Sequence, residues 1–158
     1  MVLAAGEKSA GADTSVRTRQ IVMGGNPNVG KSALFSALTG IHAEVSNYPG
    51  TTIDIAHGTL GDDNLSDTPG IYGVSSFNDE ERIARKMIVS ADLVINVGSA
   101  LSLDRDLFLT LQLIDMGKPM MLVVNQWDEA EERNMKIDLA ALSNLLKIPV
   151  VPTVAVKR

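Results

Sequence analysis

The chain carries at residues 25–32 the run Gly25-Asn26-Pro27-Asn28-Val29-Gly30-Lys31-Ser32, which matches the pattern G-x-x-x-x-G-K-[ST]. The apolar residues 21–23 before it predict the start of a strand, and residues 31–38 after it predict a helix. Glycines in such a turn let successive backbone N–H groups point at phosphate oxygens, and the helix N-terminus adds positive potential. The run therefore predicts a phosphate-binding loop, since average residue frequencies put a chance match below about one in a hundred.

Two side chains at the end of this run have the chemistry to act on a polyphosphate. We expect the Lys31 ammonium to reach the β- and γ-phosphates and the Ser32 hydroxyl to ligate Mg²⁺. Ala33 follows in the first turn of the predicted helix, and we place it in the same nucleotide-binding set. All nine residues from 25 to 33 are thus predicted to bind nucleotide.

Short apolar runs alternate with longer amphipathic segments along the rest of the chain. This alternation predicts an α/β fold with a mostly parallel sheet flanked by helices. With the phosphate-binding run before the first helix, the chain resembles a P-loop NTPase with a Ras-like G domain. Strands are expected at 52–60, 64–66, 93–97, 120–124 and 149–151, and further helices at 79–88, 103–116 and 137–146. A helix normally follows the last strand of such a sheet, so we expect the chain to lack the last helix of its domain.

Length and composition limit the class of protein. The 158 residues fit one domain, which we place at 19–158 behind a flexible leader at 1–18. With 14 basic against 19 acidic residues the net charge is −5, which argues against a nucleic-acid partner. The chain has no cysteine, and its histidines, His42 and His57, lie in different segments without a metal-binding spacing. We therefore predict no Fe²⁺ site in this chain.

Two turn-rich segments downstream predict the rest of a metal and phosphate site. Asp67 begins the sequence D-T-P-G after a short strand, where it can hold Mg²⁺ through water, and the amide of Gly70 can reach the γ-phosphate. The polar loop 47–52 contains Gly50, Thr51 and Thr52, and a threonine hydroxyl there can complete the Mg²⁺ shell when a γ-phosphate is present. We favour Thr52 over Thr51 for this role.

A third segment predicts recognition of the base. Asn125-Gln126-Trp127-Asp128 resembles the motif N-K-x-D, with glutamine in place of lysine. The Asp128 carboxylate can accept hydrogen bonds from N1–H and the exocyclic amine of guanine, which adenine lacks. Asn125 is expected to brace the loop. The final loop, which resembles a T-S-A motif that contacts the guanine from its other side, contains the residues Thr153, Val154 and Ala155.

From residue 25 to residue 155 the chain resembles the GTP-binding domain of the FeoB family of bacterial ferrous-iron transporters. The resemblance rests on the order and spacing of GNPNVGKS, NYPGTT, DTPGIYG, LDRDLFLTLQL and NQWDEA. It implies a GTPase domain at the cytoplasmic face of the inner membrane, continued in the same chain by a membrane domain that imports Fe²⁺. The resemblance leaves open whether the domain forms a homo-oligomer.

The resemblance also implies a mechanism of GTP hydrolysis. Asn28 matches the asparagine that coordinates K⁺ near the β- and γ-phosphates, so that K⁺ stimulates the reaction together with Mg²⁺. Ile71 follows Gly70 where many signalling GTPases have a glutamine that orients water, so slow turnover is expected. The catalytic set is then Lys31, Asn28, Thr52 and Gly70.

Two other classes of function remain open at this point. A soluble GTPase of ribosome assembly or tRNA modification has similar motifs but normally brings a basic RNA-binding domain. A nucleotide sensor or ATPase with relaxed specificity is compatible with Gln126 and Val154, which depart from the usual lysine and serine. The acidic charge and the family-like motifs favour the transporter domain.

Overall fold

The computed structural model describes residues 17–40, 43–75 and 77–156. Its elements in chain order are β1 (Gln20–Gly25), α1 (Lys31–Thr39), β2 (Glu44–Asn47), β3 (Asp54–Leu60), β4 (Asp63–Asp67), α2 (Asp79–Ser90), β5 (Leu93–Ser99), the 3₁₀ turn η1 (Ala100–Ser102), α3 (Leu103–Asp115), β6 (Met120–Asn125), α4 (Trp127–Glu132), α5 (Leu139–Leu146) and β7 (Val150–Pro152). None of these helices is long and apolar enough to cross a membrane.

The strands form one sheet in the order β2-β3-β4-β1-β5-β6-β7. The five strands from β4 to β7 pair in parallel, whereas β2 and β3 are antiparallel to their neighbours. In the register of β1, Met23 lies opposite Asp67 of β4 and Gly25 lies opposite Val97 of β5. The mostly parallel α/β sheet predicted from the sequence is confirmed, and the carboxyl ends of its central strands meet beside the phosphate-binding loop.

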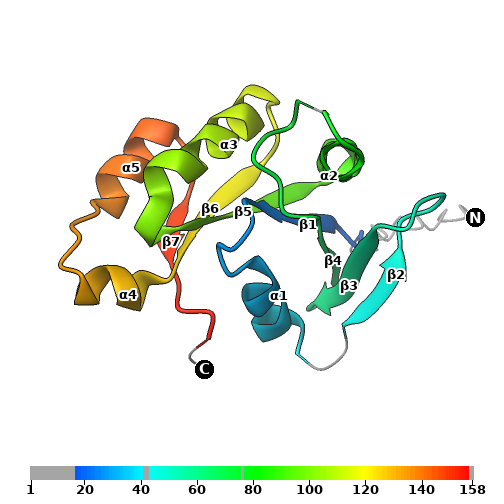
Figure 1. The fold of residues 1–158 in the computed structure, drawn as a ribbon, viewed down its shortest axis with the longest axis horizontal. Helices are drawn as coiled ribbons and strands as arrows, with labels where there is room; N and C mark the ends of the chain where they lie inside the picture. Colours follow the sequence, from blue (N-terminus) through cyan, green and yellow to red (C-terminus); the bar gives the residue numbers. More distant parts are fainter. Residues whose placement is uncertain (1–16, 41–42, 76, 157–158) are drawn as a thin grey trace, which may run out of the picture.

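Helices cover both faces of this sheet, as Figure 1 shows. Side chains alternate along β1, so that Val22 packs in a cluster with residues of α2 and α3, whereas Ile21 and Met23 pack in a cluster with Leu34 and Phe35 of α1. A third cluster joins β6 to the C-terminal helices through Leu122, Val124, Ala130 and Leu146. The buried central strands thus form a rigid base for the loops at their carboxyl ends.

Capping residues account for several helix boundaries. The Asn78 side chain accepts a hydrogen bond from the Glu81 amide at 2.7 Å and begins α2. Asp138 does the same for the Ala141 amide at 2.9 Å, so α5 begins at Leu139 rather than at 137 as predicted. The sequence analysis missed β2, whose four residues are all exposed, and α4, which begins inside the predicted base-recognition motif.

The segment before β1 is tied to the sheet by an ion pair. The Arg19 amide donates to Oδ1 of Asp63 at 2.9 Å, and its guanidinium donates to Oδ2 at 2.6 and 3.0 Å. These bonds hold the pKa of the Asp63 carboxyl below its ordinary value. Residues 1–16 of the predicted leader lie outside the described residues, so the leader remains a prediction.

On the α1 face, an apolar groove of about 230 Å³ runs beside β5, β6 and β7. Leu34 and Leu38 of α1 form one wall, and Met121, Val123 and Val151 of the sheet form its floor. The groove is a surface of the type that helices cover in open α/β sheets. The expectation that a last helix is lacking stays a prediction.

Candidate functional site

A cavity of about 440 Å³ lies at the carboxyl end of β1, where the chain turns into α1. The cavity is lined by Asn26, Pro27, Asn28, Gly30, Lys31, Ser32, Ala33, Gly70 and Glu80. Eight of these nine residues were predicted as site residues from the sequence. The exception is Glu80 in the first turn of α2, which the sequence analysis used only as a helix residue.

The D-T-P-G loop is fastened to the phosphate-binding loop through the backbone. The Thr68 amide donates to the Met23 carbonyl and the Ile71 amide to the Gly25 carbonyl, both at 3.0 Å. A Cβ atom on Gly70 would lie 3.1 Å from Cα of Pro27, so the two loops are in close contact. Gly70 therefore lies beside the phosphate-binding loop. The contact of its amide with a γ-phosphate stays a prediction.

Lys31, Ser32 and Asp67 come together at the base of the cavity. The Lys31 ammonium donates to Oδ1 of Asp67 and to the Thr68 carbonyl, and the Ser32 hydroxyl lies 3.4 Å from Oδ2 of Asp67. Burial raises the pKa of the Asp67 carboxyl, and the Lys31 charge partly opposes this shift. The Lys31 ammonium and the oxygen atoms of Ser32 and Asp67 therefore lie next to one another.

These oxygens fit a Mg²⁺ ion. Mg²⁺ takes oxygen ligands and is usually held by one or two protein groups together with phosphates and water. The Ser32 hydroxyl and the Asp67 carboxylate are such groups, and within the described ranges no cluster of three or more histidine, aspartate or glutamate residues forms a fuller cage. Of the two histidines, His42 lies outside the described residues and His57 forms a hydrogen bond with Ser66 at 2.9 Å.

Asn125 at the end of β6 connects three loops. Its amide donates to the Val29 carbonyl at 3.0 Å, and its oxygen accepts from the Thr153 hydroxyl at 3.1 Å and the Ala155 amide at 3.0 Å. Gly30, with a φ of 81°, leaves room for this side chain, because a Cβ atom there would lie 2.2 Å from Nδ2 of Asn125. These contacts give Asn125 the bracing position that the sequence predicted.

A smaller cavity of about 80 Å³ lies beside Asn125 and Gly30. It is lined by Gly30, Asn125, Gln126, Asp128, Glu129, Val154, Ala155 and Val156. Asp128 is half-buried in the first turn of α4, and Gln126 has a left-handed backbone with a φ of 59°. The structure thus brings the predicted base-recognition residues, except Thr153, to one cavity next to the phosphate-binding loop.

The polar loop that was predicted to complete the Mg²⁺ shell lies apart from these cavities. Gly50, Thr51 and Thr52 do not line the cavity of about 440 Å³, and Thr52 is exposed. The Thr51 hydroxyl donates to the Tyr48 carbonyl at 2.9 Å and accepts from the Ile53 amide at 3.2 Å. Tyr48 packs against the hydrophobic cluster under α2. The loop is therefore held by its own turn in this structure.

Comparison with known proteins identifies the family. The model of the family described as Ferrous iron transport protein B matches residues 19–158. The chain belongs to the FeoB family. The resemblance predicted from the motifs is confirmed.

The relatives of this FeoB-family domain are much longer proteins. It is 41% identical over 143 residues to the Fe(2+) transporter FeoB of Salmonella typhimurium, covering 84% of this chain and 18% of that protein. It is 39% identical over 142 residues to a Porphyromonas gingivalis protein named Fe(2+) transport protein A/Fe(2+) transporter FeoB fusion protein, covering 85% and 17%. The chain thus spans less than a fifth of the length of these relatives.

Solved FeoB structures have the same fold. A crystal structure of a mutant S. thermophilus NFeoB bound to GDP matches with a TM-score of 0.86 at 38% identity, covering 89% of this chain and 57% of that one. The cytosolic domain of T. maritima FeoB in apo form matches with a TM-score of 0.84 at 38% identity, covering 89% and 58%. The FeoB-type G-domain fold is therefore shown for this chain.

Proposed function

We propose that this domain binds GTP and GDP with Mg²⁺, hydrolyses GTP slowly with stimulation by K⁺, and regulates ferrous-iron transport. The observation that carries the proposal is that the phosphate-binding loop, with Lys31 and Ser32, lines one cavity of about 440 Å³ and that Asp67 contacts both of these side chains. The GDP-bound structure of S. thermophilus NFeoB, at 38% identity, supports it.

Phosphate binding begins from the backbone of residues 25–32. The amides at the N-terminus of α1 lie at the cavity, where they can donate to phosphate oxygens, with the helix dipole adding to the attraction. Lys31 must exchange its bonds to Asp67 and Thr68 for a phosphate oxygen as the nucleotide enters. Asp67 is then released from the ammonium, and Ser32 and Asp67 would hold Mg²⁺, which neutralises charge on the β- and γ-phosphates.

Guanine recognition falls to the smaller cavity. Asp128 can accept from N1–H and the exocyclic amine of guanine, while Val154 and Ala155 line the other side of the base. Asn125 fixes these segments against the phosphate-binding loop. The replacement of the usual lysine by Gln126 supports relaxed specificity between GTP and ATP as a second candidate property.

Hydrolysis depends on groups outside the pre-formed cavity. Ile71 stands where a glutamine could orient water, so the proposed reaction relies on the backbone around Pro49 to Thr51 to position the water and on the charge that K⁺ supplies beside Asn28. Asn28 is exposed at the cavity and has a φ of 66°. Thr52 would complete the Mg²⁺ shell only after its loop moves toward the cavity.

The transport role comes from the relatives. The S. typhimurium protein is named an Fe(2+) transporter, and 84% of this chain aligns with 18% of it. We therefore infer a nucleotide-dependent regulator that acts on a transport domain of a longer chain, at the cytoplasmic face of the bacterial inner membrane. This domain is proposed to act without a direct Fe²⁺ site, without nucleic acid, and either alone or as a homo-oligomer.

One experiment tests the proposed chemistry. Hydrolysis of GTP and of ATP is measured side by side in KCl and in NaCl, with Mg²⁺ present. A faster reaction with GTP, and a further increase in KCl, support guanine specificity and the Asn28 role. Equal rates with both nucleotides would overturn guanine specificity, and equal rates in both salts would overturn stimulation by K⁺.

A further inference from the structure

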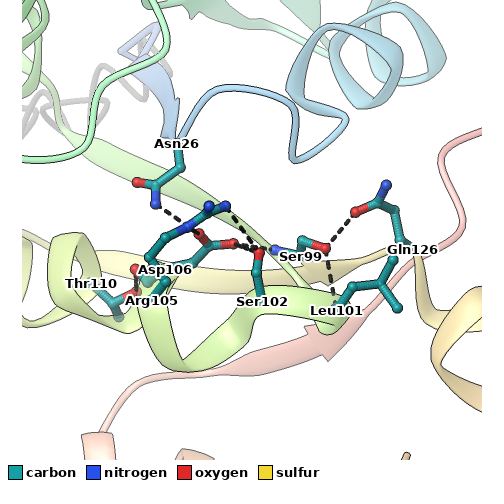
Figure 2. Close-up of polar contacts among 8 residues, drawn as sticks. All are labelled: Asn26, Ser99, Leu101, Ser102, Arg105, Asp106, Thr110 and Gln126. Carbon is teal, nitrogen blue, oxygen red and sulfur yellow. Dashed lines mark hydrogen bonds and ion pairs between the residues drawn. The ribbon is translucent and has the colours of Figure 1, made fainter.

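A buried carboxylate on α3 joins the two halves of the proposed nucleotide site. Asp106 is 3% exposed and belongs to the lining of neither cavity. Its Oδ1 accepts from Nδ2 of Asn26 at 2.7 Å, and its Oδ2 accepts from the Ser99 amide at 2.8 Å. Figure 2 shows Asp106 between these two partners, one from the phosphate-binding loop and one from the end of β5.

The contact with Ser99 continues to the base-recognition loop. The Ser99 hydroxyl donates to Oε1 of Gln126 and accepts from the Leu101 amide at 3.1 Å, which Figure 2 also shows. Gln126 has a left-handed backbone with a φ of 59°, a conformation that non-glycine residues adopt only where neighbouring contacts hold them. Gln126, which replaces the usual lysine, is thus held by Ser99, the residue at the end of β5 that Asp106 of α3 contacts.

Further donors complete the environment of the carboxylate. The Ser102 hydroxyl donates to Oδ2 at 3.2 Å, and Nε of Arg105 lies 3.4 Å from Oδ1. An ionised carboxylate is an acceptor with several lone pairs, so it can satisfy all these groups at once. A buried donor that loses such a partner retains its full desolvation penalty. Asp106 therefore connects α3 to Asn26 and to Ser99.

We propose that Asp106 is a positioning residue for nucleotide binding, which holds the phosphate-binding loop through Asn26 and the base-recognition loop through Ser99 and Gln126. This inference rests on the proposed binding of guanine nucleotides. Asn125 of the base-recognition segment bonds to Val29 of the phosphate-binding loop, so a shift of either loop changes the distance between the phosphate and base subsites. Asp106 affects affinity and base choice without contacting the nucleotide.

The free oxygen of Asn26 makes a conservative variant informative. Among the described residues, Oδ1 of Asn26 is buried and accepts no hydrogen bond. In Asp106→Asn the new amide can donate to this oxygen once the Asn26 side chain turns over, while its own oxygen still accepts from the Ser99 amide. Both connections survive in that variant. In Asp106→Leu, whose side chain has the same number and branching of heavy atoms but no hydrogen-bonding group, both are lost.

The test measures affinities of the purified domain for GDP and ADP. We expect Asp106→Leu to weaken GDP binding about 10-fold and to lower the ratio of GDP to ADP affinity, whereas Asp106→Asn stays within about 3-fold of the wild type. Ser99→Ala, which frees Gln126 but keeps the backbone bond to Asp106, should lower the same ratio with a smaller loss of GDP affinity.

Thr110→Val is the matched control. Thr110 lies one turn further along α3 and is fully buried. Its hydroxyl accepts from Nδ2 of Asn96 at 2.7 Å and donates to the backbone carbonyl of Asp106 at 3.3 Å, so Thr110→Val leaves the Asp106 carboxylate and its bonds to the two loops in place. It should lower the melting temperature while GDP affinity and base preference stay unchanged. The proposal is overturned if Asp106→Leu binds GDP as the wild type does, if Asp106→Asn is as impaired as Asp106→Leu, or if Thr110→Val lowers affinity and preference equally. A wild-type domain that fails to bind GDP at all would overturn the proposed function instead.

Discussion

The phosphate-binding loop and the loop at 48–53 contrast sharply, although both are expected to contact the same nucleotide. The first is connected to β6 through the Asn125–Val29 hydrogen bond, to the segment after β4 through Gly25, and to α3 through Asn26. The second is held chiefly by bonds within its own turn, such as those of Thr51 with Tyr48 and Ile53. The phosphate-binding loop is thus bonded to three other segments of the domain, whereas the loop at 48–53 is bonded chiefly to itself.

This contrast separates binding from catalysis. A loop fixed by several tertiary bonds needs little reorganisation to bind phosphate, which favours affinity. A loop that must leave a local turn to reach the γ-phosphate responds to the nucleotide state, which suits a switch. We therefore expect changes that disturb the packed contacts of the first loop to weaken binding strongly, and changes in the second to affect hydrolysis alone.

The largest expected difference in GDP affinity is between alanine variants of two glycines that have nearly the same φ. Gly30 and Gly50 have φ values of 81° and 78°, but an added Cβ meets Asn125 at 2.2 Å only at Gly30, while at Gly50 it meets nothing within 4 Å. Left-handed strain of about 1–2 kcal/mol is common to both alanine variants. Gly30→Ala should weaken GDP binding by about 100-fold or more. The new methyl group must push the Asn125 side chain away, and this clash adds a cost of about 2 kcal/mol or more to the backbone strain.

Gly50→Ala serves as the control, and we expect its GDP affinity to stay within about 3-fold of the wild type. Calorimetric titration with GDP gives both affinities, and thermal unfolding shows whether each variant is folded. Equal losses in the two variants would contradict the contrast between a packed loop and an open one.

The second prediction concerns Thr52 in the loop at 48–53. Thr52→Ala should slow GTP hydrolysis by about 10- to 100-fold, because a hydroxyl is lost from the Mg²⁺ shell in the transition state. GDP affinity should be unchanged, since Thr52 lies away from the cavity in this structure. Single-turnover hydrolysis separates the two effects, and Thr51→Ala tests the alternative residue. A greater loss of hydrolysis in Thr51→Ala would reverse our choice between them.

The third prediction separates two reasons for asparagine at position 28. Asn28 has a φ of 66°, which glycine adopts freely, so Asn28→Gly keeps the turn and removes only the side-chain amide. If the amide coordinates K⁺, the ratio of hydrolysis rates in KCl and NaCl should fall by about 10-fold while GDP affinity changes little. If the ratio of rates in KCl and NaCl is unchanged, the asparagine at position 28 is explained by the turn conformation alone.

The smallest effect is expected at the ion pair of Arg19 with Asp63, which lines neither proposed nucleotide cavity. Arg19 lowers the pKa of Asp63, so the stabilisation is present above the unfolded pKa of about 4 and is lost as the pH falls through the lower folded value. Asp63→Asn should lower the melting temperature at pH 7 by about 2 °C, and this difference should shrink at about pH 3. Melting curves at several pH values test this. GDP affinity at pH 7 should match the wild type, and a loss there would show that the pair affects the site.

The residues of the phosphate-binding loop could be placed from the sequence because the required geometry is local. Glycine spacing, the lysine and the hydroxyl all lie within eight residues between a strand and a helix. The alternation of apolar runs likewise gave the central strands, which are buried on both faces. It could not give β2, because the side chains of Glu44 to Asn47 are all exposed and lack the apolar signal of a core strand.

The connections between loops could not be read from the sequence. Asn26 and Asp106 are 80 positions apart, and Asn125 and Val29 are 96 positions apart, so only the pairing of parallel strands brings them together. Glu80 reaches the cavity for a similar reason, through the position of α2 over the sheet.

By itself the sequence determined the phosphate chemistry, the α/β class and the family resemblance, because motif spacing and hydrophobic periodicity are properties of neighbouring residues. The tertiary structure alone decided which loops are bonded to distant segments and which are bonded only within their own turns. That depends on buried hydrogen bonds between distant segments, whose partners are chosen by packing rather than by their place in the chain.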